Sequence, residues 1–128
     1  MDESTPTRAQ QVAWAVSVFE RERTGRPPRS VAVVLGGETL VVTLHGALSP
    51  AEQALTQTPT GAALVQEFHR VLFASACGPL RREVERLTGV AVREVAAEVQ
   101  GTTGILVQVF LLAGSVPAET WSGTAPVG

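Results

Sequence analysis

Residue types that build common functional sites are scarce in this sequence of 128 residues. It holds one cysteine, Cys77, and two histidines, His45 and His69. A single cysteine forms no internal disulfide, which suits a reducing cytosol. The metal-binding spacings CxxC and HExxH are absent. We therefore expect no metal and no other cofactor, with both histidines as ordinary surface or half-buried residues and Cys77 as a small buried apolar residue.

The sequence also lacks a strong charge of one sign and a long apolar run. Ten basic side chains stand against twelve acidic ones, and the net charge of −2 supplies no strong field for nucleic acid or an anionic membrane. The longest apolar run, 105–112, is interrupted by Gln108 and is far shorter than the roughly 20 residues that span a bilayer. Two acidic residues follow Met1, so no secretory signal is expected. We expect a soluble, cytoplasmic protein that binds no nucleic acid, does not insert into a membrane, and meets membranes only through a partner.

Signatures of catalysis are missing as well. Ser115 and Ser122 lack the GxSxG elbow of a nucleophile, and Gly36-Gly37 is too short and wrongly placed to cradle a phosphate. No nucleophile, base and orienting residue occur in a recognised arrangement. The chain is therefore not expected to be an enzyme, and a hydrolase ranks third among the functions considered. One arrangement would contradict this expectation: His45, Glu52 and His69 could converge in space.

The sequence does contain enough apolar residues for one domain, at 45% of the chain. Between residues 6 and 24, Val12, Val16 and Phe19 recur at helical spacing, and Gly25 ends the pattern. A connector with two prolines, 26–29, follows the helix. It leads into two runs rich in β-branched residues, 30–35 and 39–45, which a short glycine turn joins as a hairpin.

Two helix starts follow this hairpin in quick succession. Ser49-Pro50-Ala51-Glu52 has the form of a capping box, in which the first and last side chains each bond the other's backbone. Thr58-Pro59 repeats the start, so a short helix near 50–57 precedes a much longer one. Gly78-Pro79 is expected to kink or divide the long helix, and Gly89 ends it. One face of the long helix carries apolar residues, and a similar phase continues beyond the proline: Leu64, Phe68, Val71, Leu72, Ala76, Leu80, Val84 and Leu87.

Two further strands, 90–99 and 105–112, are expected around a turn at 100–104. The domain is assigned to 1–112, and 113–128 is expected to be a flexible tail without a periodic element. The fold class is α+β, with two layers: a four-stranded, mainly antiparallel sheet from two hairpins, a long kinked helix across one face, and an N-terminal helix. Apolar residues occur on both faces of the second and fourth strands. A homodimer is therefore expected, formed through the sheet face away from the long helix or along the N-terminal helix.

From Gly25 to Leu112 the chain resembles the bacterial MpsC family. The resemblance is carried by 40–44 running into 46–52 (GALSPAE), by 58–61 (TPTG) and by 87–90 (LTGV). It implies a small α+β domain without membrane spans, linked by name and genomic association to an ion or bicarbonate transport apparatus, and it assigns no catalytic residue. The chain departs from the family at Gly25-Arg26-Pro27-Pro28, where members have Gly-basic-Gly-Pro, and at Glu98, where members tend to carry Asp.

Candidate contacts for a ligand or a partner are the ionisable residues His45, Glu52, His69, Arg81, Arg82 and Arg86. The capping box already accounts for a glutamate at position 52, without a role in binding. The three arginines form a ridge open to an anionic partner, but the glutamates between them favour a solvated, mixed-charge face. Trp14 and Trp121 are candidates for an interface, with the core as the alternative for Trp14.

These observations favour a non-enzymatic accessory or regulatory module that acts through protein contacts near a bacterial membrane transport system, with a transport protein as partner. The alternative is a sensor domain, in which a pocket between helix and sheet binds a small anion such as bicarbonate. A pocket with convergent polar groups would discriminate between the two.

Overall fold

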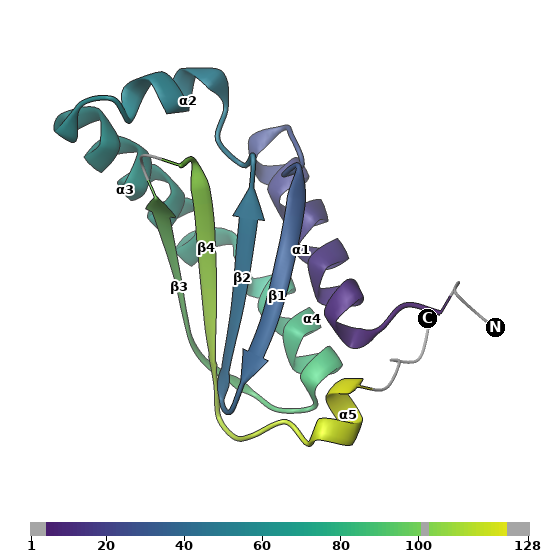
Figure 1. The fold of residues 1–128 in the computed structure, drawn as a ribbon. Coiled ribbons are helices and arrows are strands. Elements are labelled where there is room, and N and C mark those ends of the chain that lie inside the picture. Colours follow the sequence, from purple (N-terminus) through teal and green to yellow (C-terminus); the bar gives the residue numbers. More distant parts are fainter. Residues whose placement is uncertain (1–4, 101–102, 123–128) are drawn as a thin grey trace.

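One antiparallel sheet with the strand order β1-β2-β4-β3 organises the computed structural model, which describes residues 5–100 and 103–122 (Figure 1). The first hairpin pairs β1 (Ser30–Gly36) with β2 (Thr39–His45), and the second pairs β3 (Val92–Gln100) with β4 (Ile105–Leu112). The hairpins join through β2 and β4, where Val41 lies opposite Val109. The predicted α+β class and the sheet of two hairpins are confirmed.

Five helices accompany the sheet in the described part of the chain: α1 (Arg8–Thr24), α2 (Pro50–Leu55), α3 (Pro59–Ala76), α4 (Gly78–Thr88) and α5 (Ala118–Ser122). The predicted double start is present, since Ser49 caps α2 and the Thr58 hydroxyl accepts from the Gly61 N–H at the start of α3. Cys77 separates α3 from α4, so the proline divides the long helix. None of these helices is long and apolar enough to cross a bilayer.

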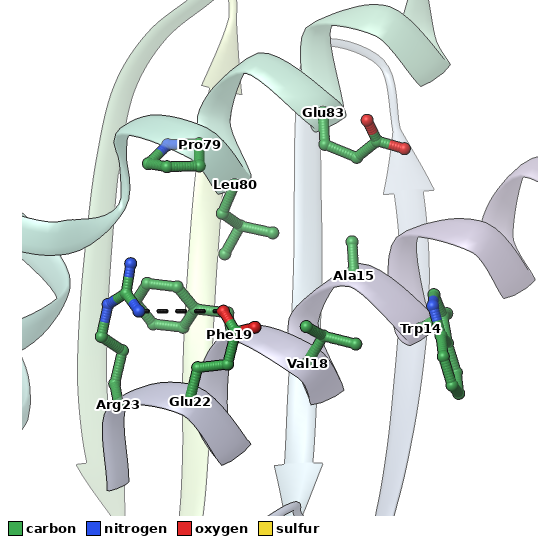
Figure 2. A pocket seen from close by; sticks show the side chains of 9 residues that line it. All are labelled: Trp14, Ala15, Val18, Phe19, Glu22, Arg23, Pro79, Leu80 and Glu83. Carbon is green, nitrogen blue, oxygen red and sulfur yellow. Dashed lines mark ion pairs between the residues drawn. The ribbon is translucent and has the colours of Figure 1, made fainter. Parts of the chain in front are cut away.

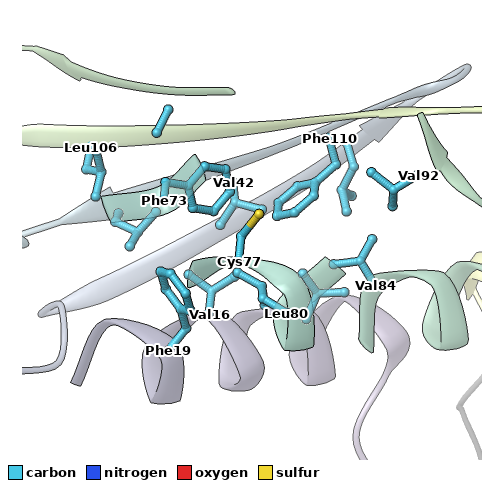
Figure 3. Packing of buried hydrophobic residues seen from close by; sticks show 14 of the residues in the cluster. Val16, Phe19, Val42, Phe73, Cys77, Leu80, Val84, Val92, Leu106 and Phe110 are labelled. Carbon is cyan, nitrogen blue, oxygen red and sulfur yellow. The ribbon is translucent and has the colours of Figure 1, made fainter. Parts of the chain in front are cut away.

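The core lies between the helices and one face of the sheet (Figure 3). Leu40, Val42 and Leu44 of β2 point into it and are fully buried. The Phe73 ring of α3 makes edge-to-face contacts with Phe19 of α1, at 5.9 Å between centroids, and with Phe110 of β4, at 5.8 Å. Such contacts add to the area burial of each ring. Cys77 is buried in this cluster, as predicted.

The opposite face of the sheet carries no helix among the described residues, because α1, α3 and α4 all lie on one side (Figure 1). Side chains alternate between the faces of a strand, and in β2 and β4 every second residue is only half buried. The open face carries the apolar residues Val34 of β1, Val41 of β2, and Val107, Val109 and Leu111 of β4. Thr39 and Thr43 of β2 and Glu94 and Glu98 of β3 lie on the same face as cross-strand neighbours. We refer to the five apolar residues as the open sheet face.

The face by which α3 packs differs from the apolar face marked in the sequence. Leu64, Phe68 and Val71 are exposed, whereas Val65, His69 and Phe73 are buried. The helix is apolar on two neighbouring stripes, and the buried stripe continues to Gly61. A Cβ at Gly61 would lie 1.9 Å from the Leu55 carbonyl oxygen, so only glycine permits this approach.

The Gln66 side chain also fixes the rotation of α3 against the edge strand β3. Its Nε2 donates to the Ala97 carbonyl at 3.2 Å, and its Oε1 accepts from the Val99 N–H at 2.5 Å. This pairing satisfies backbone groups that an edge strand otherwise leaves open. The stripe that begins at Gly61 is thereby turned toward the core.

The C-terminal segment contains a helix that was not expected. Residues 118–122 form α5, and Trp121 packs against the core cluster, so the prediction of no periodic element after residue 112 is wrong there. The reason is a tertiary contact that composition does not reveal: the Arg8 side chain donates to the Thr120 carbonyl at 2.5 Å. The rest of the predicted tail, 123–128, lies outside the described residues. Trp14, by contrast, is 69% exposed and is not part of the core.

Candidate functional site

Glu52 and His69, two of the candidate residues, meet where α2 begins. The predicted capping box is present: Ser49 Oγ accepts from the Glu52 N–H at 3.2 Å, and Glu52 Oε1 accepts from the Ser49 N–H at 2.8 Å. The second carboxylate oxygen lies 2.7 Å from His69 Nε2. The Glu52 carboxylate therefore joins the start of α2 to the middle of α3.

His69 is only 2% exposed, so the prediction of a surface or half-buried residue is wrong for it. It lies on the stripe of α3 that packs inward, and Glu52 supplies the partner that a buried imidazole requires. Partial burial raises the pKa of Glu52, but hydrogen bonds from the Ser49 N–H and from His69 outweigh this and lower the pKa overall. The carboxylate is therefore ionised near neutral pH.

A histidine beside a carboxylate is the arrangement that hydrolytic triads use to orient a general base. Two of the three residues singled out for this possibility, Glu52 and His69, do converge. His45 does not share their contact; it is half-buried at the end of β2, where its carbonyl accepts from the Arg29 N–H at 2.7 Å. Ser49 has a hydroxyl of the kind that can act as a nucleophile. In this structure the hydroxyl oxygen accepts a hydrogen bond from the Glu52 backbone N–H.

A second polar pair, Glu20 and Gln108, is buried between α1 and β4. Their exposed fractions are 2% and 0%, and Gln108 Nε2 donates to Glu20 Oε2 at 3.3 Å. The contact between these two residues is not predicted from the sequence, although each residue leaves a signal there. Glu20 continues the apolar stripe of Val12 and Val16 at the same spacing of four, and Gln108 interrupts the longest apolar run.

The protonation of Glu20 follows from its surroundings. Burial, and secondarily the charge of Glu52, raise the pKa of Glu20 to about 7. Among the described residues, Glu20 Oε1 and Gln108 Oε1 are buried without a hydrogen-bond partner. Both atoms are acceptors until Glu20 binds a proton, whereupon its hydroxyl becomes a donor. A neutral Glu20 thus removes the cost of an unpaired buried charge and adds a hydroxyl donor beside the Gln108 side chain.

A pocket of about 410 Å³ opens where the end of α1 faces α2 and α3. Its polar lining comes from Arg23, Thr24, Arg26, Ser49 and Glu52, and its apolar lining from Leu55, Leu64, Val65 and Phe68. The ligand pocket expected from the sequence lies between helix and sheet, whereas this pocket lies between helices. We refer to it as the arginine pocket.

A smaller hollow of about 270 Å³ lies between α1 and α4 (Figure 2). Trp14, Ala15 and Val18 form its α1 wall, and Pro79 and Leu80 form its α4 wall. Arg23 borders this hollow as well as the arginine pocket, and its guanidinium lies 3.8 Å from the carboxylate of Glu22.

The three arginines of α4 have separate roles. Arg81 and Glu85 hold the backbone of Val92 at the start of β3, because Arg81 donates to its carbonyl at 2.5 Å and Glu85 accepts from its N–H at 2.8 Å. Arg86 pairs with Glu83 at 2.6 Å. Arg82 is exposed, and its side chain makes no hydrogen bond to another described residue. The ridge is thus a mixed-charge face in which one arginine is free.

The described ranges, 5–100 and 103–122, contain no cluster of metal-ligating side chains. No group of three or more His, Cys, Asp or Glu side chains in them is arranged to hold a metal ion.

Similarity to known proteins extends over most of the chain. The family described as "Na+-translocating membrane potential-generating system (MpsC)" matches residues 6–114. The uncharacterized protein YbcI of Bacillus subtilis (strain 168) is 24% identical over 112 residues, which cover 88% of this chain and 90% of YbcI. No solved structure matches the chain. The family match includes α1, which lies outside the segment that carried the resemblance in the sequence.

Proposed function

Because the chain belongs to the MpsC family, we propose that it is a non-enzymatic accessory or regulatory module of a bacterial membrane transport system. It acts through protein contacts, as a homodimer, and meets the membrane from the cytoplasm through a transport protein. The family's printed description, a Na+-translocating system that generates membrane potential, supports the transport context. The observation that carries the contact role is the open sheet face.

The open sheet face has the composition of an interface. Val41 of β2 lies between Val34 of β1 and Val109 of β4 as their direct cross-strand partner, so the β-branched residues form one continuous surface. Val34 is 63% exposed and the other four residues are half-buried. Apolar surface that stays open to solvent marks an interaction site or an aggregation liability. Two sheets that pack face to face bury such surfaces about 10 Å apart. A second copy fits because a two-fold contact places the same apolar patch on both sides.

The assembly is tested by light scattering on the wild type and two variants. The wild type is expected at twice the chain mass of 13.4 kDa at micromolar concentration. Val109→Glu places a charge at the centre of the open sheet face and is expected to give a folded monomer, because a buried unpaired carboxylate opposes association. Val71→Glu, on the exposed face of α3, is the matched control and should remain dimeric. A wild-type mass near 13.4 kDa over a broad concentration range contradicts the dimer.

The accessory role is tested in cells. A photo-crosslinking residue at Arg82, which is exposed on α4, is expected to attach the protein to a membrane transport protein, whereas the purified chain alone is expected to turn over no substrate. Crosslinks confined to cytosolic proteins would argue against the transport role. A measured hydrolytic activity that is lost on His69→Gln or Glu52→Gln would argue against the non-enzymatic reading.

A second candidate function is a sensor that binds a small anion such as bicarbonate and reports its presence through assembly. The specific observation in its favour is the arginine pocket, where Arg23 and Arg26 stand beside Ser49 and Glu52. Convergent polar groups in a concave site are the usual mark of ligand recognition.

A further inference from the structure

We propose that the arginine pocket binds an organic monocarboxylate with an apolar tail, with the carboxylate on Arg23 and Arg26 and the tail against Leu64 and Phe68. The proposal rests on the second candidate function, ligand sensing, and specifies the ligand. It does not depend on the homodimer, because the pocket is built by helices and the open sheet face belongs to the other layer.

Both arginines have guanidinium N–H groups that can donate to a ligand. Arg26, in the connector after α1, makes no side-chain hydrogen bond or ion pair with another described residue. Arg23 has a 3.8 Å contact with Glu22, its sequence neighbour, and its guanidinium lies 5.4 Å from the centroid of the Phe19 ring. A guanidinium presents donors in a planar fork that matches a carboxylate. The site therefore favours a carboxylate over a cation.

Glu52 limits the charge of the ligand. Its carboxylate is already used, since one oxygen accepts from the Ser49 N–H and the other faces His69 Nε2. Arg26 is the lining cation that makes no ion pair with another described residue, because Arg23 lies 3.8 Å from Glu22. A ligand with one negative charge can pair with Arg26, whereas a second negative charge would be repelled by Glu52.

The apolar wall shows why bicarbonate alone is a poor match. Leu55 of α2 and Leu64 and Phe68 of α3 are 48%, 61% and 52% exposed, so a ligand would remove a large apolar area from water. Bicarbonate has no group to place there. The volume of about 410 Å³ falls within the range of roughly 300–1,000 Å³ that is typical of small-molecule sites.

The test uses decanoate below its micelle concentration as the probe, followed by amide NMR shifts of the full chain. Shifts are expected at residues that line the pocket. Acetate and bicarbonate, which lack the tail, are expected to bind at least tenfold more weakly, and decyltrimethylammonium, which reverses the charge, is expected not to bind there. Decanoate that binds no more tightly than bicarbonate, or no better than the cationic amphiphile, overturns the proposal.

Two variants with matched controls examine the contacts. Arg26→Gln is expected to weaken decanoate binding about tenfold, since it removes a charge-assisted hydrogen bond. Arg21→Gln, in the last turn of α1 but outside the pocket, is expected to leave the affinity unchanged. Leu64→Ser is expected to weaken the binding of decanoate. Val71→Ser, on the same exposed stripe but outside the pocket, is expected to leave the binding unchanged. Equal effects within either pair mean non-specific binding and overturn the proposal. All four positions are exposed, so the variants are expected to fold.

Light scattering with and without decanoate separates this proposal from the sensor function. A change in mass or shape on binding supports both. Specific binding without any change supports the site and contradicts the sensor.

Discussion

At the scale of single residues, the buried carboxyl group of Glu20 ties stability to pH. Its pKa in the folded chain is about 7, compared with an ordinary value of 4.5. Between these values the unfolded chain has released a proton that the folded chain keeps. The stability contribution is therefore favourable at low pH, falls as pH rises from about 4.5 to about 7, and then stays constant. The difference corresponds to about 3 kcal/mol, taken as an order of magnitude.

Replacement of Glu20 by Gln should remove this pH dependence. The amide keeps the shape, accepts from Gln108 Nε2 and can donate to Gln108 Oε1 without binding a proton. In urea denaturation we expect the variant to match the wild type near pH 4.5 and to exceed it above pH 7 by up to about 3 kcal/mol. The difference between variant and wild type isolates Glu20 from other titrating groups. Glu22→Gln, exposed on the same helix, is the control, and a pH-independent difference for Glu20→Gln would mean that folding does not raise the pKa of Glu20.

At the scale of elements, the contact between α2 and α3 depends on Gly61. A Cβ there would lie 1.9 Å from the Leu55 carbonyl oxygen, which is backbone and cannot move cheaply. Gly61→Ala is expected to cost about 2 kcal/mol or more of unfolding free energy, because overpacking outweighs the better helix propensity of alanine. At Gly78 the nearest atom to a Cβ is Arg82 Nη1 at 3.7 Å, so Gly78→Ala is the matched control and should be neutral or stabilising. Equal stability of the two variants would exclude the close approach.

The same elements show what the sequence could predict. Local signals were sufficient for the caps at Ser49 and Thr58 and for the break near Pro79, because each depends on a few neighbouring residues. The sequence could not predict which face of α3 packs inward, because two adjacent stripes of the helix are apolar. The buried stripe is determined by the close approach at Gly61 and by the hydrogen bonds of Gln66 to β3.

The candidate site was predictable only in part. The sequence marks Glu52 and His69 as candidates. They are 17 positions apart, however, and no local pattern predicts their contact. The pairing of Glu20 with Gln108 spans 88 positions and depends on the packing of α1 against the sheet. The arginine pocket likewise draws on three helices and the connector after α1.

At the scale of the whole molecule, the two layers separate the two proposed contacts. The open sheet face is available to a second copy, while the arginine pocket lies among the helices on the other side. A dimer formed through the sheets would therefore carry two arginine pockets directed away from the interface. A ligand could then reach either pocket without competing with assembly.

The strand order has a consequence for how the chain folds. Each hairpin closes locally, whereas the seam between β2 and β4 pairs Val41 with Val109, 68 positions apart (109 − 41). Closing such a long loop costs more entropy than forming either hairpin. We therefore expect the hairpins to form early and the central seam to be the last to close. Conservative truncations in the hairpin turns should accordingly slow folding with φ-values well above those of truncations at Val42 or Leu106 in the seam, and the reverse order would mean that the centre of the sheet nucleates first.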